Sequence, residues 1–363
     1  MTPARRPTRR IMLGKLAIGA DAPVSVQTMT KTDTRDVAAT VAQIRAVAEL
    51  GCDIVRLAVP DAAATAALAE IRRQVQVLLV ADIHFDYRLA IAAIEAGVDG
   101  LRINPGNIGG VEHVRAVVAA ARPRKIPIRI GVNAGSLEKS ILAHHGSATP
   151  EALVESALGH VAMLEAADYR EIKISVKASD VARTIAAYRL LAERTNYPLH
   201  LGVTEAGTFL AGTVRSCAAM GVLLEEGIGD TIRVSLTADP REEVRVGVEL
   251  LRAFGLRAPG AAVTSCPTCG RTQVDVAGVA QEIERQLESH YRANPTAPRP
   301  HVAVMGCVVN GPGEAREADI ALAGGKDVFG LYVQGELVVT IPQADAVVRV
   351  VELVKVWKGC ATG

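Results

Sequence analysis

The sequence predicts a (β/α)₈ barrel followed by a small α+β domain, and three observations support this fold class. Eight short runs rich in Val, Ile and Leu recur over residues 24–236, and Ala- and Leu-rich segments of helical length separate them. Eight such units are typical of a (β/α)₈ barrel, whereas a doubly wound sheet rarely contains so many. After the last unit, a segment rich in Gly, Pro and Ala interrupts the pattern at residues 255–262.

The eight expected barrel strands are residues 24–29, 54–59, 77–83, 100–104, 128–133, 172–177, 199–204 and 231–236. Helices are expected between them, including residues 37–50, 87–96, 150–166, 182–195 and 241–254. Thr34, Ser179 and Asp239 precede three of these helices and are expected to cap them, because short polar side chains accept hydrogen bonds from the free N–H groups of a first helical turn.

The predicted domains are a barrel at residues 1–255, a linker at 256–262 and a second domain at 263–363. The second domain is expected to contain a helix at 274–291, a strand at 301–305 and a final helix at 344–358. Short strands are expected around Ile320, Leu331 and Val338.

Composition limits the functional classes. The 363 residues carry a net charge of +1, and aromatic residues make up 3% of the chain, so neither a general attraction to nucleic acid nor a base-stacking platform is expected. The basic N-terminus lacks the apolar run of a signal peptide, and no apolar stretch is long enough for a transmembrane helix. We therefore expect a cytoplasmic protein, in which disulfides are rare and a CxxC motif indicates metal or redox chemistry.

Cationic side chains are expected to gather inside the barrel. Residues i and i+2 of a strand share a face, and the apolar face of each barrel strand should meet the helices. The opposite face then points inward, and it carries Arg56, Arg102, Arg129, Lys177, Arg233 and, as a further candidate, Lys173. Buried like charges are costly unless an anion lies among them, so the ring predicts a phosphate site, and its size suggests a diphosphate. Alternatively, these cations lie on solvated loops or pair with Asp82, Glu205 and Asp230.

Other polar residues share the inward face. Asn133 aligns with Arg129, Ser235 aligns with Arg233, and His200 lies on the seventh strand, just before Glu205. Asp82, His84 and Glu205 could act as acid–base groups, although each is also compatible with a purely structural hydrogen-bonding role.

Three cysteines predict an inorganic cofactor. Cys266 and Cys269 form a CxxC motif, and Cys307 follows in the stretch GCVVNGPGE at residues 306–314. Zinc, thioredoxin-like redox chemistry and an iron–sulfur cluster all remain possible. Three cysteines with a replaceable fourth ligand suit a [4Fe–4S] cluster, for which Glu314 is the nearest candidate carboxylate. Cys52, Cys217 and Cys360 have no partner pattern.

The chain closely resembles the bacterial 4-hydroxy-3-methylbut-2-en-1-yl diphosphate synthases of the non-mevalonate isoprenoid pathway. The matching segments are residues 26–30, 54–56, 81–85, 101–109, 129–138, 175–180, 199–207, 226–235, 266–269 and 306–314. They follow the family order over nearly the whole chain. One departure is Thr28, where the family has Ser, and the hydroxyl is kept.

The resemblance implies reductive ring opening and dehydration of 2-C-methyl-D-erythritol 2,4-cyclodiphosphate to (E)-4-hydroxy-3-methylbut-2-enyl diphosphate. Two electrons would come from flavodoxin or ferredoxin through a [4Fe–4S] cluster, and the protein would be a homodimer. By motif, the cluster ligands would be Cys266, Cys269, Cys307 and Glu314. The diphosphate ligands would be Arg56, Arg102, Arg129, Lys177 and Arg233. Glu205 would be the proton donor, with Asn133, Ser235, Asp82 and His200 around it.

Two other functions remain open at this point. One is a barrel enzyme stabilised by zinc, such as a phosphate-ester lyase or an aldolase, which would need no reductant. The other is a cluster-containing sensor without catalytic activity, which would have no use for cations inside the barrel.

Overall fold

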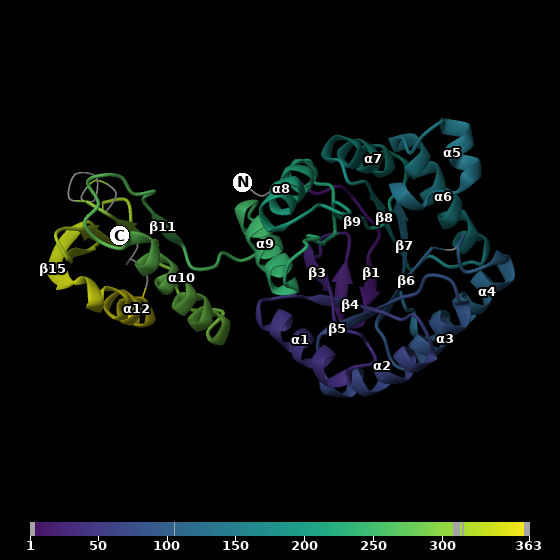
Figure 1. Cartoon of the computed structure of the whole chain (residues 1–363), viewed down its shortest axis with the longest axis horizontal. Coiled ribbons are helices and arrows are strands. Elements are labelled where there is room, and N and C mark those ends of the chain that lie inside the picture. Colours follow the sequence, from purple (N-terminus) through teal and green to yellow (C-terminus); the bar gives the residue numbers. More distant parts are fainter. Residues whose placement is uncertain (1–3, 105, 308–312, 314–315, 359–363) are drawn as a thin grey trace. The chain divides into compact units, whose positions relative to one another are not determined.

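The computed structural model of the chain describes residues 4–104, 106–307, 313 and 316–358. The chain divides into two compact units, Met1–Arg257 and Ala258–Gly363, and each is described by itself (Figure 1).

Eight parallel strands form a barrel in the first unit. They are β3 (Ser25–Met29), β4 (Ile54–Ala58), β5 (Leu78–Asp82), β6 (Gly100–Ile103), β7 (Ile128–Asn133), β8 (Ile172–Lys177), β9 (His200–Leu201) and β10 (Thr231–Ile232). Their order is β8-β7-β6-β5-β4-β3-β10-β9. The ring closes where Ile174 of β8 forms a parallel bridge with Leu199, next to a 2.9 Å hydrogen bond from the Ile174 N–H to the Pro198 carbonyl. The predicted barrel is therefore confirmed.

The last two strands are shorter than expected. β9 ends at Leu201 and β10 at Ile232, whereas the sequence predicts strands that continue to residues 204 and 236. At Gly202 the backbone approaches its neighbours so closely that a Cβ would lie 2.5 Å from the Lys177 Nζ and 2.6 Å from the Arg233 carbonyl oxygen. The chain bends here to make room for the lysine, and regular pairing stops.

Helices surround the barrel strands (Figure 1). They are α1 (Val37–Glu49), α2 (Ala62–Gln74), α3 (Tyr87–Glu95), α4 (Gly110–Ala121), α5 (Lys139–His145), α6 (Pro150–Ala166), α7 (Val181–Arg194), α8 (Phe209–Glu225) and α9 (Pro240–Ala253). Two short 3₁₀ turns, η1 (Arg122–Arg124) and η2 (Ala134–Ser136), flank β7.

Aspartates cap most of these helices. Asp239 caps α9 as predicted, but Asp36 and Asp180, rather than Thr34 and Ser179, cap α1 and α7. The Thr34 hydroxyl instead donates a 2.7 Å hydrogen bond to the Ala58 carbonyl at the end of β4. The carboxylate lies nearer to the first free N–H groups in both helices, so it takes the capping position.

The strands alternate as the sequence predicts. On β7, Ile128, Ile130 and Val132 belong to the main apolar core between the strands and the helices. Arg129 and Gly131 lie between them in sequence and so face the barrel interior.

A hairpin that the sequence analysis missed closes the amino-terminal end of the barrel. β1 (Ile11–Leu13) pairs antiparallel with β2 (Leu16–Ile18). Its apolar side chains pack against residues in the amino-terminal halves of β4 and β5. The resulting cluster is Ile11, Leu13, Ile18, Ile54, Leu78 and Val80. A Cβ at Gly100 would lie 2.5 Å from the Leu13 Cδ1, so the glycine at the start of β6 provides the space that Leu13 fills.

The second unit contains a five-stranded sheet in the order β11-β12-β13-β14-β15. Its elements are β11 (Val263–Ser265), α10 (Val276–Ala293), β12 (Val302–Met305), β13 (Ile320–Gly324), β14 (Val328–Val333), β15 (Glu336–Pro342), η3 (Gln343–Asp345) and α12 (Ala346–Val356). The first three strands are mutually parallel and the last two antiparallel.

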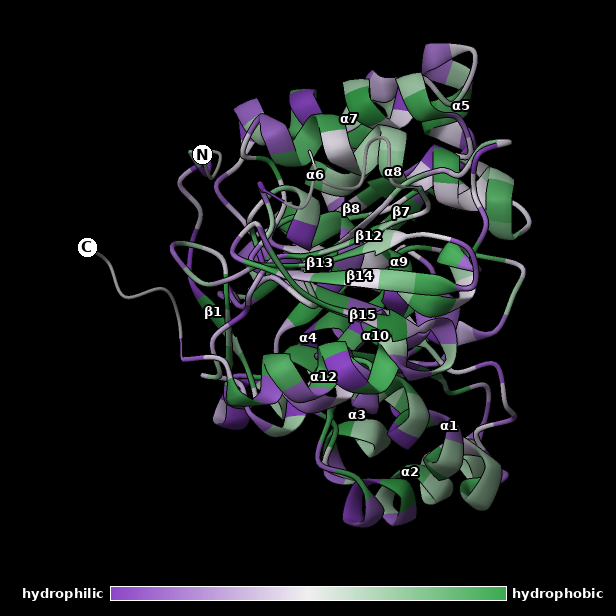
Figure 2. Cartoon of the chain, turned by 90° about the vertical axis from the view of Figure 1, so that its left-hand side faces the viewer, coloured by the Kyte–Doolittle hydropathy of each residue, from purple (hydrophilic) through white to green (hydrophobic). Residues whose placement is uncertain are grey.

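Both long helices of this unit pack on one face of its sheet. α10 contributes Ile283 and Leu287, and α12 contributes Val350 and Val354, to a core with the inner residues of β12, β13 and β14. Figure 2 shows these strands as predominantly hydrophobic. The other face carries a smaller cluster that includes Ala303, Ala321 and the half-buried Cys266. Among the described residues, no helix is both long and apolar enough to span a membrane.

Candidate functional site

A polar cavity of about 110 Å³ opens toward the carboxyl-terminal ends of the barrel strands. Seven of the eight barrel strands, or the residues directly after them, contribute to its wall. The lining residues are Arg56, Asp82, His84, Arg102, Arg129, Gly131, Asn133, Ser175, Lys177, Thr204, Arg233 and Ser235. The five cations predicted from strand periodicity therefore meet in one place, together with Asn133, Ser235 and Asp82.

The strand register arranges the inward-facing residues in successive layers of four, as (β/α)₈ barrels do. The register relations that fix these layers run around the whole ring. From the amino-terminal end upward, three layers are Ile54/Gly100/Lys173/Thr231, Gln27/Val80/Arg129/His200 and Arg56/Arg102/Ser175/Arg233. The interior thus changes from apolar at the hairpin to cationic below the mouth.

The cationic side chains are held in place by the barrel itself. The Arg129 guanidinium donates a 3.1 Å hydrogen bond to the Ser175 hydroxyl, and that of Arg102 donates a 3.1 Å bond to the Gly131 carbonyl. A Cβ at Gly131 would lie 2.7 Å from the Arg102 Nε. Any larger residue at position 131 would therefore collide with the Arg102 side chain where it crosses β7.

Only part of the positive charge is balanced inside the cavity. The Asp82 carboxylate lies 3.2 Å from the Arg102 guanidinium and 3.6 Å from that of Arg56. Asp230, which could have paired with the ring, instead forms a 2.6 Å ion pair with Arg5. Glu205 is exposed. Of the alternative partners for the cations, Asp82 alone lies among them, so among the described residues that line the cavity five cations meet one carboxylate.

The pKa values reflect this imbalance. Burial, followed by repulsion from Arg56 and Arg102, holds the pKa of Arg129 well below its usual range. Burial and then four neighbouring arginines do the same to the pKa of Lys177. Burial lowers the pKa of Arg56 to about 10, although Asp82 opposes the change. Each lowered pKa means that the folded barrel disfavours the charged form, and an anion in the cavity would relieve that cost.

The pKa of Asp82 shifts in the direction expected of an ionised group. Burial alone would raise it, but Arg56, Arg102 and Arg129 together lower it. Asp82 is therefore a carboxylate at neutral pH. It accepts a 3.2 Å hydrogen bond from the Arg102 guanidinium and pairs with that of Arg56 at 3.6 Å.

Glu243, on the first turn of α9, is a buried residue of the site that the sequence analysis missed. Its carboxylate accepts hydrogen bonds from the Thr28 hydroxyl at 2.7 Å and from the Leu236 N–H at 3.1 Å. It also lies 3.4 Å from the Arg233 guanidinium and 3.3 Å from the Lys31 ammonium. Glu243 thus fixes Arg233 from behind the cavity. The sequence offers no signal for this, because Glu243 lies beside Glu242 on an ordinary amphipathic helix.

His200 and Lys173 lie beneath the cavity and are absent from its wall. His200 is fully buried and its Nδ1 lies 2.7 Å from the Thr231 hydroxyl. Burial, followed by repulsion from Lys177 and Arg129, holds the pKa of His200 well below its usual range, so the ring is neutral. Lys173 is also buried, and none of the described residues offers its Nζ a hydrogen-bond partner.

Glu205 lies at the mouth, one residue beyond Thr204 of the cavity wall. Its φ angle is +52°, in the left-handed region that non-glycine residues rarely adopt. Such strain concentrates where a side chain must be presented in one direction. The exposed carboxylate of Glu205 is therefore held at the rim by its backbone.

The three cysteines of the second unit come from the same end of two neighbouring parallel strands. β11 pairs with β12 in the register Ser265 to Val304, so Cys266 and Cys307 follow their strands side by side. The Cys266 N–H donates to the Val304 carbonyl at 3.1 Å, and the Gly306 N–H donates to the Cys266 Sγ at 3.2 Å. Cysteines that are distant in the sequence are thus brought to one edge of the sheet.

The loop between Cys266 and Cys269 has a defined shape. Thr268 has a φ angle of +66°, and the Cys269 N–H donates a 3.1 Å hydrogen bond to the Thr272 hydroxyl. Gly306 must be small, because a Cβ there would lie 2.8 Å from the Thr272 Cγ2 and 2.9 Å from the Val276 Cγ2. Backbone N–H groups close to cysteine sulfur are typical of iron–sulfur sites, where they stabilise the charge on the thiolates.

The spacing of the thiols bears on the metal. A single tetrahedral zinc with Zn–S bonds of about 2.3 Å would bring its sulfur ligands to roughly 3.8 Å from one another. Within the described residues, the one group of three or more possible ligands whose donor atoms all lie within 4.8 Å is His144, His145 and Glu155. The three cysteines do not form such a compact group.

Glu314, which the sequence analysis predicts as the fourth cluster ligand, lies outside the described residues. Cys52 and Cys217 belong to the barrel unit. Burial raises the pKa of Cys52 to about 12 and also raises that of the half-buried Cys217, which disfavours the reactive thiolate form of both.

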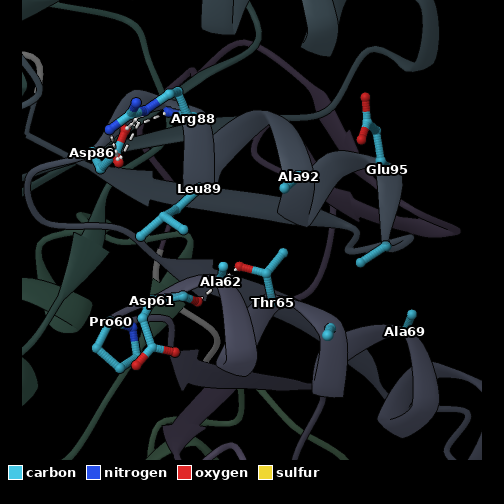
Figure 3. Close-up of a pocket in the computed structure, with 12 residues that line it drawn as sticks. Pro60, Asp61, Ala62, Thr65, Ala69, Asp86, Arg88, Leu89, Ala92 and Glu95 are labelled. Carbon is cyan, nitrogen blue, oxygen red and sulfur yellow. Dashed lines mark hydrogen bonds and ion pairs between the residues drawn. The ribbon is translucent and has the colours of Figure 1, made fainter.

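A second hollow of about 870 Å³ lies outside the barrel, in a groove between α2 and α3 (Figure 3). Leu89 and small side chains such as Ala62 and Ala69 form its floor. Asp61 and Asp86, which cap the two helices, lie at its rim. None of the cavity cations lines this groove, so it is separate from the candidate site.

Two family models match the chain. The first, described as the GcpE TIM-barrel domain, matches residues 8–248, and the second, described as the GcpE protein C-terminal domain, matches residues 262–356. A relative from Geobacter sulfurreducens is 58% identical over 93% of this chain and 94% of its own length. One from Ruminiclostridium cellulolyticum is 54% identical over 96% and 97%. Both are named 4-hydroxy-3-methylbut-2-en-1-yl diphosphate synthase (flavodoxin).

Among solved structures, the barrel resembles dihydropteroate synthase from Stenotrophomonas maltophilia. The TM-score is 0.51 at 14% sequence identity, and the match covers 68% of this chain and 97% of that one. At this identity the similarity concerns the barrel fold alone.

Glu243 provides a test of the site geometry. Glu243→Gln should lower the free energy of unfolding of the barrel by about 2–4 kcal/mol, because Arg233 and Lys31 lose a buried counter-charge. Glu242→Gln, one residue earlier on the same turn of α9, should change it by less than about 1 kcal/mol. Urea denaturation measures both. Equal effects of the two substitutions would show that Glu243 does not hold these cations.

Proposed function

The chain belongs to the GcpE family and is an oxidoreductase that produces 4-hydroxy-3-methylbut-2-en-1-yl diphosphate, and on this premise we propose how its residues divide the reaction. The reaction starts from 2-C-methyl-D-erythritol 2,4-cyclodiphosphate. The bond between C2 and the diphosphate oxygen breaks, and this oxygen stays on the phosphate. The C3 hydroxyl leaves as water, a C2–C3 double bond forms, and two electrons and one proton are consumed.

The observation that carries the proposal is the excess of cations in the barrel. Arg56, Arg102, Arg129, Lys177 and Arg233 would bind the diphosphate, for which bidentate guanidinium groups and a lysine point charge are suited. Asn133 and Ser235 on the same wall would donate or accept hydrogen bonds and so orient it. Fixing both phosphates holds the carbon skeleton in one position and stabilises the charge that develops when the ring opens.

Glu205 would give the proton that the leaving hydroxyl needs. Its exposed position, one residue beyond Thr204 of the cavity wall, places a carboxyl group at the rim. Asp82 and His200 would support the site. Asp82 would hold Arg56 and Arg102 in place through its ion pairs with them. His200 would connect β9 to β10 through its hydrogen bond with the Thr231 hydroxyl.

Cys266, Cys269 and Cys307 would hold a [4Fe–4S] cluster, with Glu314 as the fourth ligand. When bound, such a cluster supplies electrons to the substrate one at a time. The donor set fits it, because the three thiols leave adjacent parallel strands and the Cys266 sulfur accepts a backbone N–H. A carboxylate is a weaker ligand for cluster iron than a thiolate. With Glu314 as the fourth ligand, one iron would therefore have a ligand that another oxygen group could replace.

We expect flavodoxin, which the names of the relatives specify, to be the electron donor, with ferredoxin as the alternative. We also propose a homodimer. Phe209, Leu210 and Val214 are exposed apolar residues on one stripe of α8, and Leu210 is 74% exposed, so a second copy of the chain could cover them. Sedimentation of the holoenzyme at micromolar concentration should show a dimer, and a monomer would contradict the proposal.

Arg129→Met tests the diphosphate site. The substitution should weaken binding of the cyclic diphosphate by at least about 30-fold, because a buried charge–charge contact is lost. The substrate-free protein should keep or gain stability, since the lowered pKa of Arg129 marks a charge that is buried at a cost. Isothermal titration calorimetry and thermal melting measure the two effects.

Arg124→Met is the matched control for Arg129→Met. Arg124 is exposed and lies five residues earlier, before the same strand, so its loss should leave binding within about twofold of wild type. Equal binding by wild type and the Arg129 variant would rule out the proposed diphosphate site.

Cys307→Ser tests the cofactor. Wild-type protein purified without air should contain about four iron and four sulfide per chain, and the variant should lose most of both, because one thiolate anchor is missing. Cys217→Ser, on α8 of the barrel, should keep the wild-type content. A wild-type protein with one zinc and no iron would favour a structural zinc site and would contradict the reductase proposal.

A further inference from the structure

Lys173 is an unusual residue for the interior of a barrel. It is 3% exposed, and no hydrogen-bond partner in the described part of the chain reaches its Nζ. The Nε2 atoms of His200 and Gln27, in the next layer of the barrel, are also buried without a partner. Three polar groups on β8, β9 and β3, in two adjacent layers of the barrel, thus have free hydrogen-bonding capacity.

A buried lysine without a counter-ion is not explained by stability. Burying an unpaired ammonium is costly, and an apolar side chain of similar length would fit the same place without that cost. Unsatisfied polar atoms of this kind are usually hydrated by internal water, which also gives protons a route through the interior. The position of Lys173, one layer below Arg129, therefore points to a role that depends on its charge.

We propose that Lys173 binds a proton from solvent when the diphosphate enters the cavity, so that substrate binding and proton uptake are coupled. The inference rests on the proposed function, because it requires that a diphosphate binds among the cations above. The step is balanced by itself: the lone pair of the neutral amine forms one N–H bond, and solvent supplies the proton.

The charges around Lys173 support this coupling. Arg129 faces it from β7, in register with it, and repels a charged ammonium. Lys177 lies further along β8, and Arg56 and Arg102 lie two layers above Lys173. His200 on β9 is neutral. Asp230, before β10, attracts it but is paired with Arg5. The residues of the same and adjacent layers on β3, β4, β5 and β6, which are Gln27, Ile54, Val80 and Gly100, carry no charge. The surroundings are therefore cationic until an anion arrives.

The size of the effect can be judged from the pKa of Lys173 in the free protein. Burial first, and then Arg129, lowers this pKa to about 7, against a weaker opposing effect of Asp230. A negative charge about 8–10 Å away at an effective dielectric constant of about 20 would raise it by more than one pH unit. At pH 7.5 the amine would change from mostly neutral to mostly protonated.

The direction of the pH dependence follows from linkage. A group whose pKa is raised by binding takes up a proton, so affinity is highest where the free amine is already protonated and falls as pH rises above 7. Below about pH 6 the amine is protonated in both states, and the uptake due to Lys173 should vanish.

The test is isothermal titration calorimetry of the oxidised holoenzyme with the cyclic diphosphate. Titrations at pH 7.5 in two buffers of different ionisation enthalpy give the number of protons taken up per ligand. Lys173→Met should reduce this number by about half a proton or more relative to wild type. Lys125→Met, which removes an exposed lysine before β7, should leave it unchanged.

Each outcome decides the proposal. Equal proton uptake by wild type and Lys173→Met would overturn it. Without ligand, the variant should melt at or above the wild-type temperature, because an unpaired buried amine is lost; a lower melting temperature would assign Lys173 a structural role and would also overturn it. Absence of any binding by wild-type protein would overturn the proposed function itself, and with it the coupling.

Discussion

Five cationic side chains share the barrel interior with the single carboxylate of Asp82, and much of the surrounding structure serves to keep them there. Gly131 and Gly202 leave room for Arg102 and Lys177 where any side chain would collide with them. Glu243 holds Arg233 from outside the ring, through contacts that also fix the ends of β3 and β10. Burial first, and then repulsion from neighbouring arginines, lowers the pKa values of Arg129 and Lys177, so the charged forms are held there at a cost. The folding free energy of the barrel thus maintains a cavity in which positive charge exceeds negative charge.

Strand periodicity was sufficient to predict this ring, because alternation assigns each cation to the interior once the barrel is recognised. It could not predict how deep each residue lies, since depth depends on the register of all eight strands. His200 and Lys173 share the inward face with Arg129 and Lys177, yet they lie below the cavity. Glu243 and the β1–β2 hairpin escaped prediction for a related reason. Glu243 and the hairpin act through contacts between segments far apart in sequence, and no local sequence pattern predicts such contacts.

The cysteines illustrate the opposite case. Their identity and spacing suggested a cofactor, but the spacing left zinc, redox chemistry and an iron–sulfur cluster open. The fold adds what spacing lacks: β11 and β12 are parallel neighbours, so the residues after both strands emerge at one edge. Sequence analysis placed the CxxC motif before a helix but missed β11 itself, a strand of three residues whose burial is only partial. Such a short, half-exposed strand has too little alternation to be recognised without its partner.

The β1–β2 hairpin covers the amino-terminal end of the barrel, so the interior is open at its carboxyl-terminal end. Leu13 occupies the space that Gly100 leaves, and the apolar cluster above it separates the cations from the bulk solvent on that side. A ligand that reaches the cations therefore has to enter from the mouth, where the cavity opens. It also has to leave through the same opening before another ligand can take its place. The β1–β2 hairpin, at the opposite end of the barrel from the mouth, thus makes the entry and exit of ligands sequential.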